Sequence, residues 1–247
     1  GKKVRYRVII GDETDIDTFL GYHSGSSKVA GRAFFSTKGF YIALDTIRPG
    51  FNRLKILRKR LEEKVQIKEA REIFKNFKYS RNAANIFLQT SFKNEVLQDN
   101  WDNFYKKILL REIELVHNHE LGHIVDFPCF LPVYSNVGNI VSMLWNQSFS
   151  PQKIQTRFEL VAETFGLSHT SDPDYYMFEM FERLDVPLDG IFELVYWAWY
   201  GRTAQNDPYY LTSLEISKNI FSYLNDENEI KISNAARKLW ASYVKCE

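Results

Sequence analysis

The chain contains little cysteine and almost no net charge. Only two of its 247 residues are cysteines, Cys129 and Cys246, and they lie far apart in the sequence. A single pair forms no disulfide framework and identifies no redox compartment. The 32 basic and 31 acidic residues leave a formal net charge of +1. We therefore expect neither a nucleic acid nor a membrane surface as a partner.

Long apolar runs, internal repeats and low-complexity segments are absent as well. No apolar run approaches the roughly 20 residues that a transmembrane helix requires, and we expect no membrane span. No signal peptide is visible, but the chain begins with Gly1-Lys2-Lys3 instead of methionine, as expected for a processed or truncated polypeptide. The residues themselves therefore leave the compartment and the oligomeric state unknown.

What the chain does contain is typical of a globular α+β protein. Hydrophobic residues make up 45% of the sequence and charged residues 26%, which is ordinary for a globular fold. Residues 1–50 are predicted to be β-rich. Val4–Ile10 alternates as a strand does, and Ala33–Phe35 and Phe40–Leu44 flank a turn, which predicts a hairpin.

From residue 51 onward the sequence predicts helices, over residues 51–126 and in a helical lobe of residues 127–247. The predicted helices are Arg53–Lys78, Asn82–Leu97, Trp101–Asp126, Pro173–Leu184, Pro187–Tyr200, Pro208–Leu224 and Lys231–Val244. Pro128 is expected to end the third of them. The apolar segment Phe127–Asn146 forms either a pocket wall or a packed loop with a short helix. We expect one domain over residues 1–247.

The predicted helix Trp101–Asp126 contains the segment His119-Glu120-Leu121-Gly122-His123. Positions i and i+4 of an α-helix lie on one face, so His119 and His123 can bind one metal ion. Glu120 follows the first histidine and can act as general base on a water molecule at the metal. This pattern is typical of zinc peptidases. The alternative is two helical histidines that make ordinary hydrogen bonds.

A catalytic zinc site needs a third protein ligand. The predicted helix Arg157–Gly166 carries Glu159 and Glu163 four residues apart on one face, and Gly166 is a predicted C-cap. We assign Glu159 to the metal because Leu167, the i+4 partner of Glu163, cannot bind a metal ion. We assign Glu163 to a hydrogen bond with a ligand imidazole. The alternative for this pair is a solvated stripe on an amphipathic helix.

Asp126 lies on the same face of the predicted metal helix, three residues after His123. A carboxylate at this position can hydrogen-bond a ligand histidine without touching the metal. A capping role or a surface salt bridge is equally compatible with the sequence.

The two segments resemble a known family. His119–Asp126, with the sequence His-Glu-Leu-Gly-His-Ile-Val-Asp, and Phe158–Phe165, with the sequence Phe-Glu-Leu-Val-Ala-Glu-Thr-Phe, are similar to the gluzincin branch of the zincin metallopeptidases. Within that branch they are most similar to the catalytic domain of anthrax lethal factor and to the Pro-Pro endopeptidases. The similarity covers about fifty residues in the middle of the chain.

This resemblance implies a zincin-like fold, in which a small N-terminal sheet and a metal-binding helix face a mainly helical C-terminal lobe. It implies Zn²⁺ as cofactor, with His119, His123 and Glu159 as ligands, Glu120 as catalytic base and Glu163 in support. The reaction would be hydrolysis of a peptide bond in a peptide or protein substrate. The resemblance also favours a secreted or periplasmic location.

The family fold places an edge strand of the sheet beside the metal helix, where a substrate can bind as an added strand. We expect Ala33–Leu44 either to supply this edge or only to close the sheet. The family also has a tyrosine before the metal glutamate, whose hydroxyl stabilises the oxyanion. Here that stretch is Ser150–Ile154, which lacks tyrosine, and the role could pass to Tyr134, Tyr175, Tyr176 or His169.

Two other functions are compatible with the sequence. A zincin-like protein can bind Zn²⁺ without hydrolysing anything and regulate a partner by binding it. A helical interaction protein could also contain the histidine motif by chance. The metal content of the purified protein separates the second alternative from the others.

Overall fold

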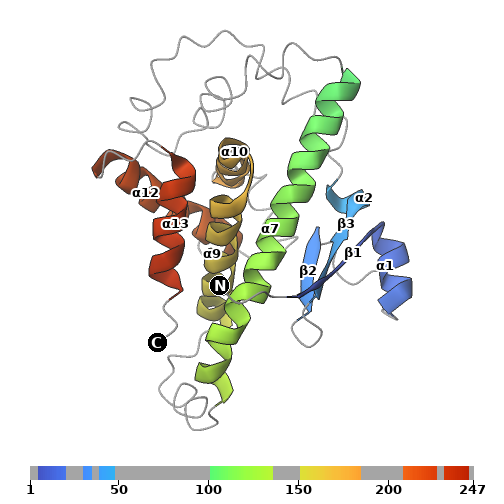
Figure 1. The fold of residues 1–247 in the computed structure, drawn as a ribbon, viewed down its shortest axis with the longest axis horizontal. Coiled ribbons are helices and arrows are strands. Elements are labelled where there is room, and N and C mark those ends of the chain that lie inside the picture. Colours follow the sequence, from blue (N-terminus) through green and yellow to red (C-terminus); the bar gives the residue numbers. More distant parts are fainter. Residues whose placement is uncertain are drawn as a thin grey trace, which may run out of the picture.

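The computed structural model describes residues 5–20, 30–34, 39–47, 101–135, 151–184, 208–226 and 231–244. It shows a mixed α/β architecture, with a small three-stranded sheet near the N-terminus and helices over most of the other described residues (Figure 1). This confirms the predicted small sheet followed by a mainly helical second half. The predicted helices Arg53–Lys78, Asn82–Leu97 and Pro187–Tyr200 lie outside the described residues.

The sheet consists of β1 (Arg7–Gly11), β2 (Gly31–Phe34) and β3 (Gly39–Ala43), in the order β1-β3-β2. β1 runs parallel to β3, whereas β2 pairs with β3 as the antiparallel hairpin that the sequence predicted. β3 is buried over its whole length between its two neighbours. Because β2 stands at the end of this order, it is an edge strand of the described sheet.

Two short helices lie in the region that was predicted to be β-rich. α1 (Glu13–Leu20) follows β1, and α2 (Leu44–Ile47) follows β3. The Asp12 carbonyl accepts a hydrogen bond of 3.1 Å from Ile16 N–H, and the Ile16 side chain is buried against the sheet. The prediction for this region was therefore incomplete, because one strongly buried apolar residue gives too little periodicity to reveal a short helix.

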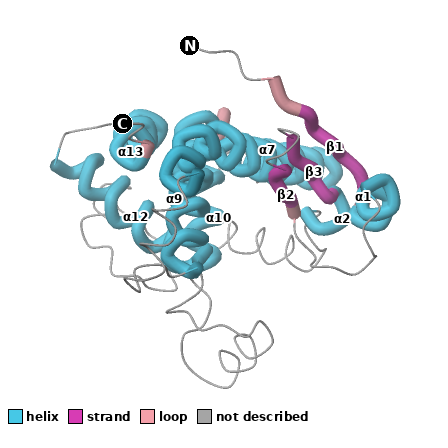
Figure 2. The backbone as a smooth tube through the Cα atoms, turned by 90° about the horizontal axis from the view of Figure 1, so that it is seen from below, coloured by secondary structure: helices cyan, strands magenta, loops and turns pink. Residues whose placement is uncertain are grey.

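α7 (Trp101–Ser135) is the central element of the described structure. Figure 1 and Figure 2 show the sheet, with α1 and α2, on one side of α7 and the helices that follow α7 in the chain on the other. These helices are α9 (Pro151–His169), α10 (Pro173–Leu184), α12 (Pro208–Asp226) and α13 (Ile232–Tyr243). One apolar core joins both sides, and its members include Phe40, Ile42, Phe104, Ile108, Val116, Leu160, Met177 and Ile216.

α7 continues beyond Asp126, where the sequence predicted its end, as far as Ser135. The prediction that Pro128 ends the metal helix was therefore wrong. A proline removes one N–H donor and crowds the preceding turn, which bends or weakens a helix without always ending it. The segment Phe127–Asn146 is accordingly helical up to Ser135, and its residues 136–146 lie outside the described residues.

The predicted C-terminal helices agree closely with α10, α12 and α13. The prediction that Gly166 caps the preceding helix was wrong, because α9 continues to His169 and the Gly166 carbonyl accepts an ordinary helical hydrogen bond from Thr170 N–H at 2.9 Å. The glycine serves packing instead. A Cβ at this position would lie 2.8 Å from Tyr176 Cζ, so only glycine leaves room for that ring.

Gly122 allows α7 and α9 to approach closely at the histidine motif. A Cβ at this position would lie 2.7 Å from Ala162 Cα and 2.9 Å from the Ala162 carbonyl oxygen. The two helices therefore meet backbone against backbone at small residues. This approach brings the histidines of α7 within reach of the carboxylates of α9.

We expect Gly122→Ala to destabilise the protein by about 1–3 kcal/mol, because the added methyl group must push α9 away from α7. At an exposed helical position the same substitution would stabilise the protein by roughly 0.5–1 kcal/mol. The sign of the change in the free energy of unfolding therefore separates a glycine packed against a neighbouring helix from an exposed one. Chemical denaturation of the metal-free wild type and variant measures the free energy of unfolding. A more stable variant would contradict the close approach of the two helices.

Candidate metal centre

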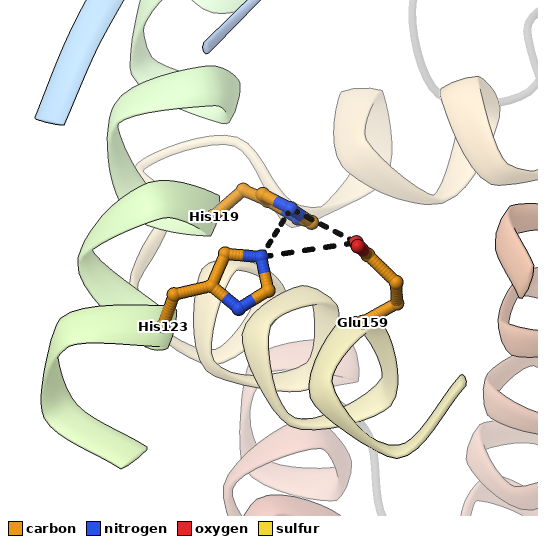
Figure 3. Close-up of side chains that lie close together, drawn as sticks. All are labelled: His119, His123 and Glu159. Atoms are coloured by element: carbon orange, nitrogen blue, oxygen red, sulfur yellow. Dashed lines mark hydrogen bonds and ion pairs between the residues drawn. The ribbon is translucent and has the colours of Figure 1, made fainter. Parts of the chain in front are cut away.

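Three predicted ligand side chains meet between α7 and α9. His119 Nε2 lies 3.1 Å from His123 Nε2 and 3.2 Å from Glu159 Oε2, and His123 Nε2 lies 3.8 Å from the same oxygen. Figure 3 shows the two rings and the carboxylate pointing toward one another. All three residues are less than a tenth exposed. The structure thus forms a buried group that can bind a metal ion.

The donor atoms and their separations suit a metal ion. Four ligands arranged tetrahedrally at the usual zinc distances lie about 3.3–3.4 Å from one another, and the three separations observed here fall on both sides of that value. Glu159 Oε2 is buried, and its closest polar neighbour among the described donors is His119 Nε2, which lies near it without a well-formed hydrogen bond. Because an unsatisfied carboxylate oxygen is costly to bury, a bound cation would stabilise it.

Burial and the charges within this cluster shift the pKa values of His119, His123 and Glu159 in different directions. Burial alone would lower the pKa of His119, but the carboxylates of Glu163 and Glu159 outweigh it and raise this pKa well above its ordinary value. Burial, and then the charge of His119, lower the pKa of His123 to about 4. Burial would raise the pKa of Glu159, but the adjacent His119 lowers it below its ordinary value. A divalent cation could therefore replace the positive charge that His119 supplies.

Glu163 lies on the other side of the His119 ring. Its Oε1 is 3.5 Å from His119 Nδ1, and its Oε2 accepts a hydrogen bond of 2.6 Å from the Tyr176 hydroxyl. Glu159 therefore faces one ring nitrogen of His119 and Glu163 faces the other. The structure places the two glutamates where the sequence assigned them, and their roles as ligand and as support stay predictions.

The side chain of Glu120 extends from α7 to the edge strand β2. The Ala33 backbone N–H donates a hydrogen bond to its carboxylate, and a Cβ at position 31 would lie 2.8 Å from Glu120 Oε1. Burial raises the pKa of Glu120 to about 7, supported by the charges of Glu159 and Glu163, against the lowering effects of His119 and of the Ala33 N–H. A carboxyl group that titrates near neutral pH can both take up and release a proton there.

Asp126 makes no hydrogen bond to the histidines. Its side chain is 1% exposed, and neither carboxylate oxygen has a hydrogen-bond partner among the described residues. Burial raises the pKa of Asp126, although the charge of Arg157 opposes this. His123 Nδ1, the ring atom that a supporting carboxylate would contact, also has no hydrogen-bond partner in the described part of the chain. The proposed Asp126–histidine hydrogen bond is therefore not formed here.

The side chains proposed as oxyanion donors are largely engaged elsewhere. The hydroxyls of Tyr175 and Tyr176 both donate to buried carboxylates, and His169 stacks on Phe165 with the ring centroids 4.0 Å apart. The side chain of Tyr134 lies outside the described residues. No donor for an oxyanion is identified in the described ranges.

Sequence reasoning missed two contributions to the site. It gave Gly31 and Ala33 no role at Glu120, and it considered Tyr176 only as an oxyanion donor. Both contributions depend on contacts between residues far apart in the chain, for which neither segment carries a local pattern. The contribution of Gly31 and Ala33 could have been found only by placing β2 against the helix that carries the histidines, and the hairpin prediction left that placement open.

The arrangement can hold a divalent cation and place a buried carboxylate next to its first ligand. Every helix in the described ranges is too short or too polar to span a bilayer. Comparisons of the chain with protein-family models, with curated proteins and with solved structures find no match.

Proposed function

We propose that the protein is a zinc-dependent metallopeptidase with a zincin-like fold. The observation that carries this proposal is the convergence of His119, His123 and Glu159 from two helices, with Glu120 directly after the first of them. Two histidines and one glutamate are a donor set of catalytic zinc sites, which keep a further position open for water or substrate. The resemblance of both helices to the gluzincins supports the same interpretation.

The proposed roles follow from these positions. Zn²⁺ bound by the three ligands would polarise the scissile carbonyl and lower the pKa of a water molecule. Glu120 would take a proton from the attacking water and deliver it to the nitrogen of the leaving amine. Glu163 would hold the His119 ring in the orientation that directs Nε2 toward Glu159.

The edge strand β2 is suited to binding the substrate in this proposal. The Ala43 N–H donates to the Ala30 carbonyl at 2.9 Å. Since hydrogen bonds alternate along an antiparallel pair, the main-chain groups of Gly31 and Ala33 point away from β3. The outward Ala33 N–H already donates to the Glu120 carboxylate. An extended peptide could therefore pair with the Gly31 N–H and with the carbonyls of Gly31 and Ala33, and would then lie beside Glu120. β2 would then supply the edge that the sequence attributed to the Ala33–Leu44 hairpin.

Gly31→Ala is expected to lower kcat, by up to about 10²-fold, because a displaced general base transfers the proton less well. Zinc affinity should stay unchanged, because no ligand is removed. The added Cβ would lie 2.7 Å from Val116 Cγ1 and 2.8 Å from Glu120 Oε1, so the glutamate must move. Steady-state kinetics and zinc titration measure the two effects separately.

Gly11→Ala is the matched control for this substitution. It adds the same methyl group in β1, where the Cβ would make only an ordinary contact of 3.6 Å with Ile16 Cγ1. We expect the control to retain both hydrolysis and zinc. If Gly31→Ala also retained the full kcat, β2 would not position Glu120.

Cleavage of a peptide library of diverse sequence tests the proposed function. We expect the zinc-loaded protein to produce new N-termini that mass spectrometry detects, and we expect a chelator to stop the cleavage until Zn²⁺ is added back. Zinc-loaded protein that leaves the library uncut would favour the non-catalytic, partner-binding alternative. Protein that binds no metal would favour a chance motif.

A further inference from the structure

Two adjacent tyrosines of α10 donate hydrogen bonds to carboxylates on two other helices. Tyr175 and Tyr176 are 2% and 1% exposed. The Tyr175 hydroxyl lies 2.7 Å from Glu112 Oε1 on α7, and the Tyr176 hydroxyl lies 2.6 Å from Glu163 Oε2 on α9. Of these two contacts, only the second continues toward the candidate metal centre.

A chain of polar contacts runs from Tyr176 through Glu163 to His119. One carboxylate oxygen of Glu163 accepts the tyrosine hydroxyl, and its other oxygen faces His119 Nδ1 at 3.5 Å. Glu163 is only 1% exposed, so water does not compete strongly for its oxygens. The fold also reserves space for the tyrosine, because any side chain at Gly166 would collide with its ring.

We propose that Tyr176 is a positioning residue of the metal centre, a role that rests on the proposed function. Its hydroxyl fixes the rotation of the Glu163 carboxylate. The fixed carboxylate accepts the Nδ1 proton of His119 and thereby leaves the Nε2 lone pair directed at the ion. In this role Tyr176 is not a metal ligand, and it acts on the metal centre through Glu163.

Tyr176→Phe tests this role, with Tyr175→Phe as the matched control. Both substitutions keep a buried ring in the core and remove a hydroxyl that donates to carboxylate oxygen. The Tyr175 hydroxyl also lies 3.2 Å from Glu179 Oε1 on its own helix, so the control should cost at least as much folding stability as Tyr176→Phe. We expect Tyr176→Phe to weaken Zn²⁺ binding by about 10-fold, the lower end of the range for partners outside the ligand shell. We expect Tyr175→Phe to bind Zn²⁺ as the wild type does.

Competition with a chromophoric chelator measures the Zn²⁺ dissociation constants, and the visible spectrum of the Co²⁺-loaded proteins reports on ligand geometry. We expect the spectrum to change only for Tyr176→Phe. In a Glu163→Ala background, Tyr176→Phe should have no further effect on Zn²⁺ affinity, because the connecting carboxylate is gone. Equal affinities of Tyr176→Phe and wild type would overturn the proposal, and so would equal losses in the two tyrosine variants.

Glu163→Asp keeps the proposal testable if Tyr176→Phe does not fold. The shorter side chain cannot reach both Tyr176 and His119, so Zn²⁺ affinity should fall, and unchanged affinity would overturn the proposal. Metal binding is the measured quantity throughout. A wild type that binds Zn²⁺ but cleaves no peptide would therefore reject the peptidase activity without altering this test, whereas a wild type that binds no Zn²⁺ would overturn both.

Discussion

Glu120→Gln is expected to abolish hydrolysis while leaving the metal in place. The substitution removes the base that takes the proton of the attacking water, and loss of a general acid–base group costs roughly 10²–10⁴ in rate. The amide keeps the shape of the side chain and can still accept the hydrogen bond from Ala33 N–H. Because burial raises the pKa of Glu120 to about 7 in the metal-free protein, a neutral group in its place should disturb the metal-free fold little.

Steady-state hydrolysis and elemental analysis of the same preparation measure the two effects. Glu114→Gln is a suitable control, because Glu114 lies on the same helix and its carboxylate bonds Ser171 at 2.6 Å, away from the histidines. We expect the control to hydrolyse as the wild type does. Full activity of Glu120→Gln with bound zinc would remove Glu120 from the mechanism.

His123→Ala is expected to lose both the metal and hydrolysis. The substitution removes one of three converging donor atoms, and Nε2 of this residue lies within 3.8 Å of both other donors. The loss of zinc affinity should exceed the roughly 10–100-fold that is typical when only an outer hydrogen-bond partner is removed. Zinc titration and peptide hydrolysis should therefore fail together, in contrast to Glu120→Gln.

His117→Ala controls for the removal of a histidine from the same helix. His117 Nδ1 lies 3.1 Å from Asn118 Oδ1 and its Nε2 lies 3.4 Å from the Tyr6 hydroxyl, so neither nitrogen belongs to the metal group. We expect this variant to retain zinc. A His123→Ala protein that still held one zinc per chain would contradict the ligand assignment.

The parts of the site that were predictable are those that follow from spacing within one helix. His119 and His123 share a face by the geometry of a single turn, and Glu159 and Glu163 do the same. Local patterns also predicted the hairpin, from two apolar stretches that flank a turn, and the C-terminal helices, from apolar residues at helical spacing. Such patterns reveal which residues lie together along one element, but they do not show which elements meet.

The parts that were not predictable depend on packing between elements. Gly166 looks like a helix end because glycine favours C-caps, yet it is glycine because the Tyr176 ring lies against it. Gly122 lies against the backbone at Ala162, and Gly31 lies against Glu120. A glycine that serves close approach has the same local sequence as one that serves a turn, so only the fold separates them.

We propose above all that three side chains of α7 and α9 bind one zinc ion. Elemental analysis of protein purified without chelator, on wild type and Glu159→Ala in parallel, tests it most directly. We expect about one zinc per chain in the wild type, from a site with three protein ligands, and a marked loss of zinc in the variant. A wild type without zinc even after the metal is added, or a variant with undiminished zinc, would contradict it.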